Sequence, residues 1–239
     1  MENLEEQSLS EHLSDLRKAL LWSILFITIG FAASFSQSEL IFDFARKPIE
    51  PFIGQGLVFT GVMDKFIAHI KVSILAGIIL SSPFWLYQVW NFISPALYKN
   101  EKRYAVVFLS VGTLLFLAGC AFVYYLVYPL AFDFLLSFAG QTDSPMITID
   151  KYISFFLTTS LAFGFMFELP LVLTLLGMLG VIDADFLVRY RRYAIVILAL
   201  GSALVTPPDV ISMAMMMVPM ILLYEASVLS VRMFAKKKS

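Results

Sequence analysis

The sequence is poor in the side chains that build metal centres and disulfide-linked folds. It has one cysteine, Cys120, and two histidines, His12 and His69, which lie far apart in the chain. A single cysteine excludes an internal disulfide framework, and the two histidines lack the spacing of zinc ligands. We therefore expect no metal site and no cofactor.

Sequence motifs for catalysis are missing as well. The chain contains no G-x-x-x-x-G-K-[ST] phosphate loop and no H-E-x-x-H metalloprotease motif. No serine–histidine pair in the hydrophobic segments suggests an activated nucleophile. We expect no catalytic residue, and therefore no enzyme, and nucleic acid is not an expected partner.

Charge is scarce, and hydrophobic residues are abundant. Charged residues make up 15% of the 239 residues and hydrophobic residues 59%, whereas soluble domains contain about 25% charged residues. These values predict an all-α polytopic membrane protein, with residues 1–239 forming one integral membrane domain. Its acidic N-terminus predicts no cleavable signal peptide. Six spans are expected, at residues 19–35, 66–92, 104–138, 152–178, 193–205 and 210–229.

The fifth and sixth predicted spans are short. The fifth has about 13 residues, which is roughly 20 Å of helix, and the hydrocarbon core of a bilayer is about 30 Å thick. The residues between them, Thr206, Pro207, Pro208 and Asp209, leave room only for a tight hairpin. We therefore expect a bilayer that is thinned beside this hairpin.

Prolines mark further breaks in the predicted helices. Pro48 is expected to end a short amphipathic helix near residues 39–46, between the first two spans. Pro83 and Pro170 are expected to bend the second and fourth spans. Together with Pro207, Pro208 and Asp209, these prolines are predicted to shape the fold.

The distribution of basic residues predicts the orientation in the membrane. Twelve of the 17 lysines and arginines fall on one side of the six spans and five on the other. The positive-inside rule then places both termini in the cytoplasm. Residues 1–18 (an amphipathic segment expected to lie on the membrane surface), 94–103, 180–192 and 230–239 are predicted to be cytoplasmic, and loops 36–65 and 139–151 are predicted to be periplasmic.

Glu168 is an acid in the middle of the fourth predicted span. It lies roughly 24 Å and 15 Å from the two ends of that helix. It is either a buried acid that hydrogen-bonds another span of the same chain, or a contact for a partner helix or substrate. A proton-coupled secondary transporter that uses Glu168 is an alternative, although the sequence has no second acid at this depth and no inverted repeat. Gln88 is a candidate inter-helix contact.

Five motifs, taken in order, resemble the TatC family, the polytopic subunits of the twin-arginine protein translocase. The resemblance covers almost the whole chain. The motifs are HLSDLRK at 12–18, SPFWLYQVW at 82–90, PALYKNEKR at 95–103, FGFMFELP at 163–170 and TPPD at 206–209.

This resemblance implies a receptor in the bacterial cytoplasmic (inner) membrane. Such a protein has six spans in a concave, glove-like arrangement. It binds twin-arginine signal peptides of folded precursor proteins and recruits single-span TatA/TatB-type subunits for export driven by the proton-motive force. The resemblance also implies self-association within the complex.

The same resemblance assigns candidate site residues. For the signal peptide they are Glu101, Asp15 and Arg17, with Phe92 and Leu97 beside its hydrophobic part. Carboxylates suit this role because a guanidinium presents paired donors. For the partner helix the candidates are Glu168, Gln88 and Leu204.

Overall fold

The regular structure of this protein is helical. The computed structural model describes residues 9–54, 56–93, 104–137, 146–205 and 210–234. In these residues, the only extended pairing is an isolated parallel bridge between Val58 and Thr148. The all-α prediction is confirmed. The helices are α1 (Leu9–Phe35), α2 (Ser38–Arg46), the 3-10 helix η1 (Glu50–Phe52), α3 (Asp64–Leu80), α4 (Ser82–Ile93), α5 (Tyr104–Phe122), the π-helix η4 (Val123–Val127), α6 (Tyr128–Ser137), α7 (Ile149–Phe167), α8 (Leu169–Met178), α9 (Ala184–Arg189), α10 (Arg191–Val205) and α11 (Val210–Phe234).

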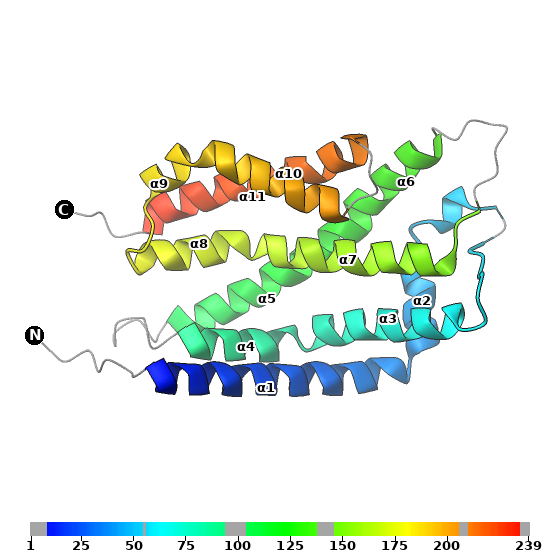
Figure 1. The fold of residues 1–239 in the computed structure, drawn as a ribbon, viewed down its shortest axis with the longest axis horizontal. Helices are drawn as coiled ribbons and strands as arrows, with labels where there is room; N and C mark the ends of the chain where they lie inside the picture. The colour runs from blue at the N-terminus through cyan, green and yellow to red at the C-terminus, as the bar shows by residue number, and fades with distance from the viewer. Residues whose placement is uncertain (1–8, 55, 94–103, 138–145, 206–209, 235–239) are drawn as a thin grey trace, which may run out of the picture.

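The long helices lie side by side. In Figure 1, α1 and the α3–α4 pair form one side, α10 and α11 form the other, and α7–α8 runs between them, while α5 crosses obliquely. In the part of the chain that the structure describes, four helical segments are long and apolar enough to cross a membrane, and the bent pair α3–α4 makes a fifth candidate. With 15 residues, α10 is shorter than these.

Of the two short helices predicted for the hairpin at the end of the chain, only the first has the expected length. As expected, α10 is short, at 15 residues or about 22 Å. The prediction of a short sixth helix is wrong, because α11 continues past Leu229 to Phe234 and has 25 residues. The predicted span ended at Leu229 because polar residues follow it in the sequence. In the structure, Ser230 and Arg232 belong to the same unbroken helix. Pro207, Pro208 and Asp209 lie outside the described residues.

The amino-terminal segment joins the first span without a break. Residues 1–18 were expected to form an amphipathic helix that runs into the first span, and the described part, from Leu9, belongs to the single helix α1 (Figure 1). Nothing in the residues from Leu9 to Phe35 breaks the helix, since this stretch has no proline and its one glycine, Gly30, is tolerated.

Helix boundaries lie beside three of the prolines that the sequence singled out, and a measured bend accompanies one of them, Pro83. The α3–α4 pair bends by 58° at Ser81, next to Pro83. The bend is held by the Trp85 indole, which donates to the carbonyl of Ile78 at 3.0 Å. Pro170 lies in the first turn of α8, where its missing N–H leaves no hydrogen bond unmade. Pro48 follows the end of α2 at Arg46.

The short helix α2 crosses the ends of the long helices (Figure 1) and is tied to them by tyrosines. Its buried face carries Phe42 and Ala45. The carbonyl groups of its last turn, which have no partner inside the helix, accept hydrogen bonds from two hydroxyls. Tyr124 donates to the carbonyl of Phe44 at 2.9 Å, and Tyr152 donates to that of Ala45 at 2.6 Å.

Glycines allow the closest contacts between the long helices. A Cβ atom at Gly77 of α3 would lie 2.5 Å from the backbone nitrogen of Phe31, and one at Gly30 of α1 would lie 2.6 Å from the carbonyl oxygen of Gly77. A Cβ at Gly119 of α5 would lie 2.5 Å from the carbonyl oxygen of Phe163 in α7. These distances are below van der Waals contact, so α1–α3 and α5–α7 pack at separations that only glycine permits.

Gly77→Ala tests the contact between α1 and α3. The added methyl group meets backbone rather than a movable side chain, so the helices must separate, and we expect a loss of about 1–3 kcal/mol of stability. Thermal unfolding of the purified protein in detergent measures this loss. Gly201→Ala in α10 is the control, because its Cβ would meet nothing within 4 Å. Equal melting temperatures for the two variants would contradict the close packing.

Candidate functional site

Glu168 lies at the junction between two helices. It is the last residue before α8 and the first after α7, and it has helical dihedral angles, φ −75° and ψ −16°. Its N–H donates to the carbonyl of Phe165 at 3.1 Å, and its carbonyl accepts from the N–H of Val172 at 2.9 Å. The backbone of the acid is therefore satisfied within its own segment.

The Glu168 side chain is buried against α5. It is 7% exposed, and a Cβ at Gly112 would lie 3.3 Å from its Oε2 and 3.1 Å from the Leu171 side chain. Among the described residues, Oε1 has no hydrogen-bond partner. The acid thus lies behind another helix of its own chain, as the first interpretation of the sequence requires, but the hydrogen bond that this interpretation assumed is not made.

Two of the three residues that were expected to contact a partner helix lie on helices on opposite sides of α7–α8. Gln88 is half-buried on α4, and Leu204, near the end of α10, is 87% exposed. In Figure 1, α4 and α10 lie on opposite sides of α7–α8, the pair joined at Glu168. The segments of Gln88 and Glu168 meet at the rings of Trp85 and Phe165, whose centroids are 5.8 Å apart.

The candidate residues for a signal peptide lie at one end of the molecule as far as they are described. Asp15 and the exposed Arg17 are in the first turns of α1, and Phe92, partly buried, is in the last turn of α4. Asp15 makes a loose ion pair with Lys18, 3.7 Å between Oδ1 and Nζ, on an exposed surface. Glu101 and Leu97 lie outside the described residues.

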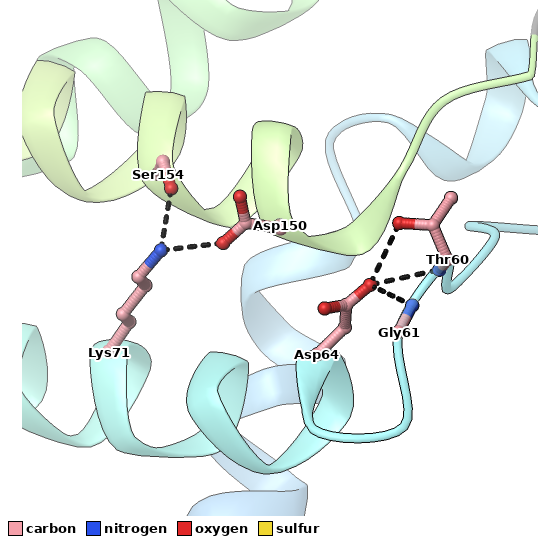
Figure 2. Close-up of polar contacts among 6 residues, drawn as sticks. All are labelled: Thr60, Gly61, Asp64, Lys71, Asp150 and Ser154. Atoms are coloured by element: carbon pink, nitrogen blue, oxygen red, sulfur yellow. Dashed lines mark hydrogen bonds and ion pairs between the residues drawn. The ribbon is translucent and has the colours of Figure 1, made fainter.

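A polar contact that the sequence did not predict joins α3 to α7 at the opposite end of the molecule. Figure 2 shows the Lys71 ammonium donating to Asp150 Oδ1 at 2.7 Å and to Ser154 Oγ at 2.8 Å. Lys71 could have drawn attention as a cation in an apolar run, but its partner is 79 residues away in the chain.

Asp64 orders the turn before α3 in the same region. One of its carboxylate oxygens, Oδ2, accepts hydrogen bonds from the N–H and hydroxyl of Thr60 and from the N–H of Gly61, at 2.7–3.0 Å (Figure 2). Nearby, Val58 pairs with the backbone of Ile147 and Ile149. These contacts fix the loop before α3 against the start of α7.

The polar groups of the described residues do not gather into one cluster of possible metal ligands. Within the described ranges, no group of three or more histidine, cysteine or acidic residues could hold a metal ion. The Glu168 side chain lies beside Gly112 and Leu171, with no nucleophile or base among the contacts described above. The apolar helices and this isolated acid define a polytopic helical membrane protein.

Comparisons with known proteins identify the family. The family described as "Sec-independent protein translocase protein (TatC)" matches residues 11–219. A relative with the same description from Desulforapulum autotrophicum is 40% identical over 236 residues, which is 98% of this chain and 87% of the relative. One from Aquifex aeolicus is 38% identical over 233 residues, covering 96% and 97% of the two chains.

A solved structure shows the same fold. A crystal structure described as the twin-arginine translocase receptor TatC superposes with a TM-score of 0.85 at 38% identity, covering 92% of this chain and 98% of that one. The chain belongs to the TatC family. It is therefore a component of the twin-arginine protein translocase and not an enzyme, and the transporter alternative gains no support.

The ion pair between α3 and α7 leads to a stability prediction. Lys71→Met and Asp150→Asn should each destabilise the protein, and the double variant should lose less than the sum of the two. We expect a coupling of about 0.2–1 kcal/mol, because both side chains are partly exposed, 29% and 51%. Thermal unfolding in detergent measures the cycle, with Lys65→Met as a control on an exposed lysine in the same helix. Strictly additive effects would argue against the pairing.

Proposed function

We propose that this chain is the receptor subunit of its translocase. It binds signal peptides with two adjacent arginines at one end of the molecule and single-span TatA/TatB-type subunits within the membrane. The proton-motive force then drives export of the folded precursor. The observation that carries the proposal is that the first turns of α1, which contain Asp15, lie at the same end of the molecule as the helix ends that flank residues 94–103, the stretch that contains Glu101 in the sequence.

Packing supports a joint site for Asp15 and Glu101. The first turns of α1, the end of α4 and the start of α5 lie at the same end of the molecule (Figure 1), and α4 packs against both α1 and α5. The ion pair of Asp15 with Lys18 is long and exposed and contributes little. A guanidinium that binds a carboxylate through two parallel hydrogen bonds displaces such a lysine readily.

Other groups at this end fit the remainder of a signal peptide. Phe92 and Leu97 are proposed to contact its hydrophobic stretch, and Arg17, exposed beside Asp15, can donate to its backbone carbonyls. A peptide with two arginines needs acids against a basic background, and Arg189, Arg191, Arg192 and Arg232 supply that background at the same end.

The same basic background supports a cytoplasmic location for this end. Cytoplasmic segments of membrane proteins carry an excess of lysine and arginine. Both termini are then cytoplasmic, and the opposite end, with α2 and the Lys71–Asp150 pair, faces the periplasm. In a bacterial inner membrane this orientation presents Asp15 to precursor proteins before export.

Two surfaces are proposed for partner helices. One is the outer face of α10, which exposes apolar side chains along its length and ends near Leu204. The other involves Glu168, whose Oε1 has no partner among the described residues. A partner helix with a polar side chain would compensate this buried oxygen and so stabilise a conformation in which the acid leaves its contact with Gly112.

Binding of paired arginines against paired lysines tests the receptor proposal. A signal peptide with two arginines should bind the purified protein more tightly than the same peptide with two lysines. Lysine cannot make the bidentate contact. Glu101→Gln and Asp15→Asn should each weaken the arginine peptide by about tenfold, which corresponds to one charge-assisted hydrogen bond.

Asp185→Asn is the matched control for this experiment, because Asp185 is an exposed acid of α9 at the same end of the molecule. Its affinity for the peptide should not change. Equal affinities for the two peptides would reject a receptor role and leave that of an assembly scaffold.

Glu168→Ala tests the intramembrane contact. In a variant with Cys120→Ala and a new cysteine at Val172, which is 46% exposed one turn from the acid, Glu168→Ala should reduce crosslinking to a partner helix severalfold. Glu168→Gln should preserve much of it, since an amide still forms hydrogen bonds in lipid. Unchanged crosslinking in the alanine variant would assign Glu168 a role in packing alone.

A further inference from the structure

An apolar groove opens between α3 and α5 at the end of the molecule that carries α2. Both helices pack against α7, which forms the floor, and α2 crosses one end. The groove has a volume of about 430 Å³, within the range of about 300–1,000 Å³ typical of ligand sites. Its walls are hydrocarbon and aromatic, with Leu75 and Ile79 on α3, Ala121 and Leu117 on α5, and Phe156 on α7.

The polar atoms in the interior of this groove have partners inside the protein. The Tyr124 hydroxyl donates to the carbonyl of Phe44 at 2.9 Å, and Ser160 Oγ lies 2.8 Å from the Tyr128 hydroxyl. The Cys120 thiol points to the carbonyl of Ser160 at 3.7 Å. Apart from Tyr125 on the exposed rim, the described polar groups of the groove need no outside partner, in contrast to Glu168, and the chemistry of its interior matches a hydrocarbon chain.

A polar hollow continues from the end of the groove. It follows the outer face of α2 and the turn before it, from Ser36 to Lys47, and shares Leu40 and Phe44 with the groove. Asp43 and Lys47 lie in it one helical turn apart, close enough for neighbouring side chains to reach one ligand. The site thus changes from apolar to charged along its length.

The charges of the hollow are of both signs. Arg46 pairs with Glu50 at 2.8 Å and only loosely with Asp43, at 3.5 Å, so Asp43 retains acceptor capacity. The ammonium of Lys47 lies 6.0 Å from the centre of the Phe44 ring, which in turn stacks on Tyr124 at 4.3 Å. Among the described residues Lys47 forms no ion pair, and Glu39 adds a second carboxylate to the hollow.

We propose that this site binds one phospholipid with an ethanolamine headgroup. An acyl chain lies in the groove between α3 and α5, the phosphate contacts Lys47, and the primary ammonium contacts Asp43 or Glu39. A headgroup with both charges matches the hollow, whereas a purely anionic one faces two carboxylates. The proposal is independent of the receptor function, since none of its residues belongs to the signal-peptide or partner-helix site.

A transmembrane helix fits this place less well than a lipid chain. With its side chains, a helix is about 10–12 Å wide, whereas the groove is limited to about 430 Å³ and is crossed at one end by α2. The bilayer, in contrast, supplies acyl chains at every apolar surface of the protein. Exposed Leu80 and Tyr125 on the rim leave the groove open toward the surrounding lipid.

Lipid retention by the full chain tests the proposal. The protein, purified in detergent, is titrated with palmitoyl-oleoyl phosphatidylethanolamine or phosphatidylglycerol, and bound lipid is counted by native mass spectrometry. We expect one tightly bound phosphatidylethanolamine, and tighter binding of this lipid than of phosphatidylglycerol. Ala121→Trp fills the groove and should abolish retention. Ala118→Trp, on the same helix but outside the groove, should retain the lipid.

A second pair of variants removes only surface charge. Lys47→Gln should weaken phosphatidylethanolamine about fivefold, the effect of one lysine at a lipid headgroup. Lys65→Gln, an exposed lysine outside the hollow, should not. If Ala121→Trp does not fold, lipid binding by the Lys47→Gln and Lys65→Gln variants still tests the proposed site. Equal retention within either pair, or equal affinity for the two lipids, would overturn the proposal.

Discussion

Direct contact between backbones through glycine is the interaction on which this arrangement of helices depends. In lipid, no hydrophobic effect drives one apolar helix onto another, so association rests on close van der Waals packing and on hydrogen bonds. The pairs α1–α3 and α5–α7 gain this packing at Gly30, Gly77 and Gly119, where any Cβ would collide with backbone. The oblique path of α5 follows, and so does the burial of Glu168, because α5 passes over the acid at Gly112.

Several polar groups near the ends of the helices are paired with partners far away in the sequence. Tyr124 and Tyr152 bind the carbonyl groups at the end of α2, and Lys71 binds Asp150 across two helices. Because an unpaired polar group inside a bilayer is costly, these contacts restrict where α2 and the loop after it can lie. Glu168 differs from these groups: its side chain is buried, and its Oε1 has no hydrogen-bond partner among the described residues.

Local chemistry made much of the fold predictable. The apolar runs located the long helices, the amphipathic stretch located α2, and Pro83 and Pro170 located two breaks, because proline acts on its own helix. Features that join distant segments were not predictable: the contact of Gly112 with Glu168 and the pairing of Lys71 with Asp150 both depend on how helices cross. The continuation of α11 past Leu229 was missed because hydropathy records composition and not helical geometry.

The length of α10 has a consequence beyond a single molecule. At about 22 Å it is shorter than the roughly 30 Å hydrocarbon layer, so if α10 crosses the membrane as the sequence predicts, the two lipid leaflets approach each other along its exposed face. Deforming a membrane costs elastic energy over an annulus around each protein. When two copies approach with these faces together, their annuli merge and the total elastic energy falls. A membrane-spanning helix of this length therefore favours lateral attraction between copies without any specific contact between them.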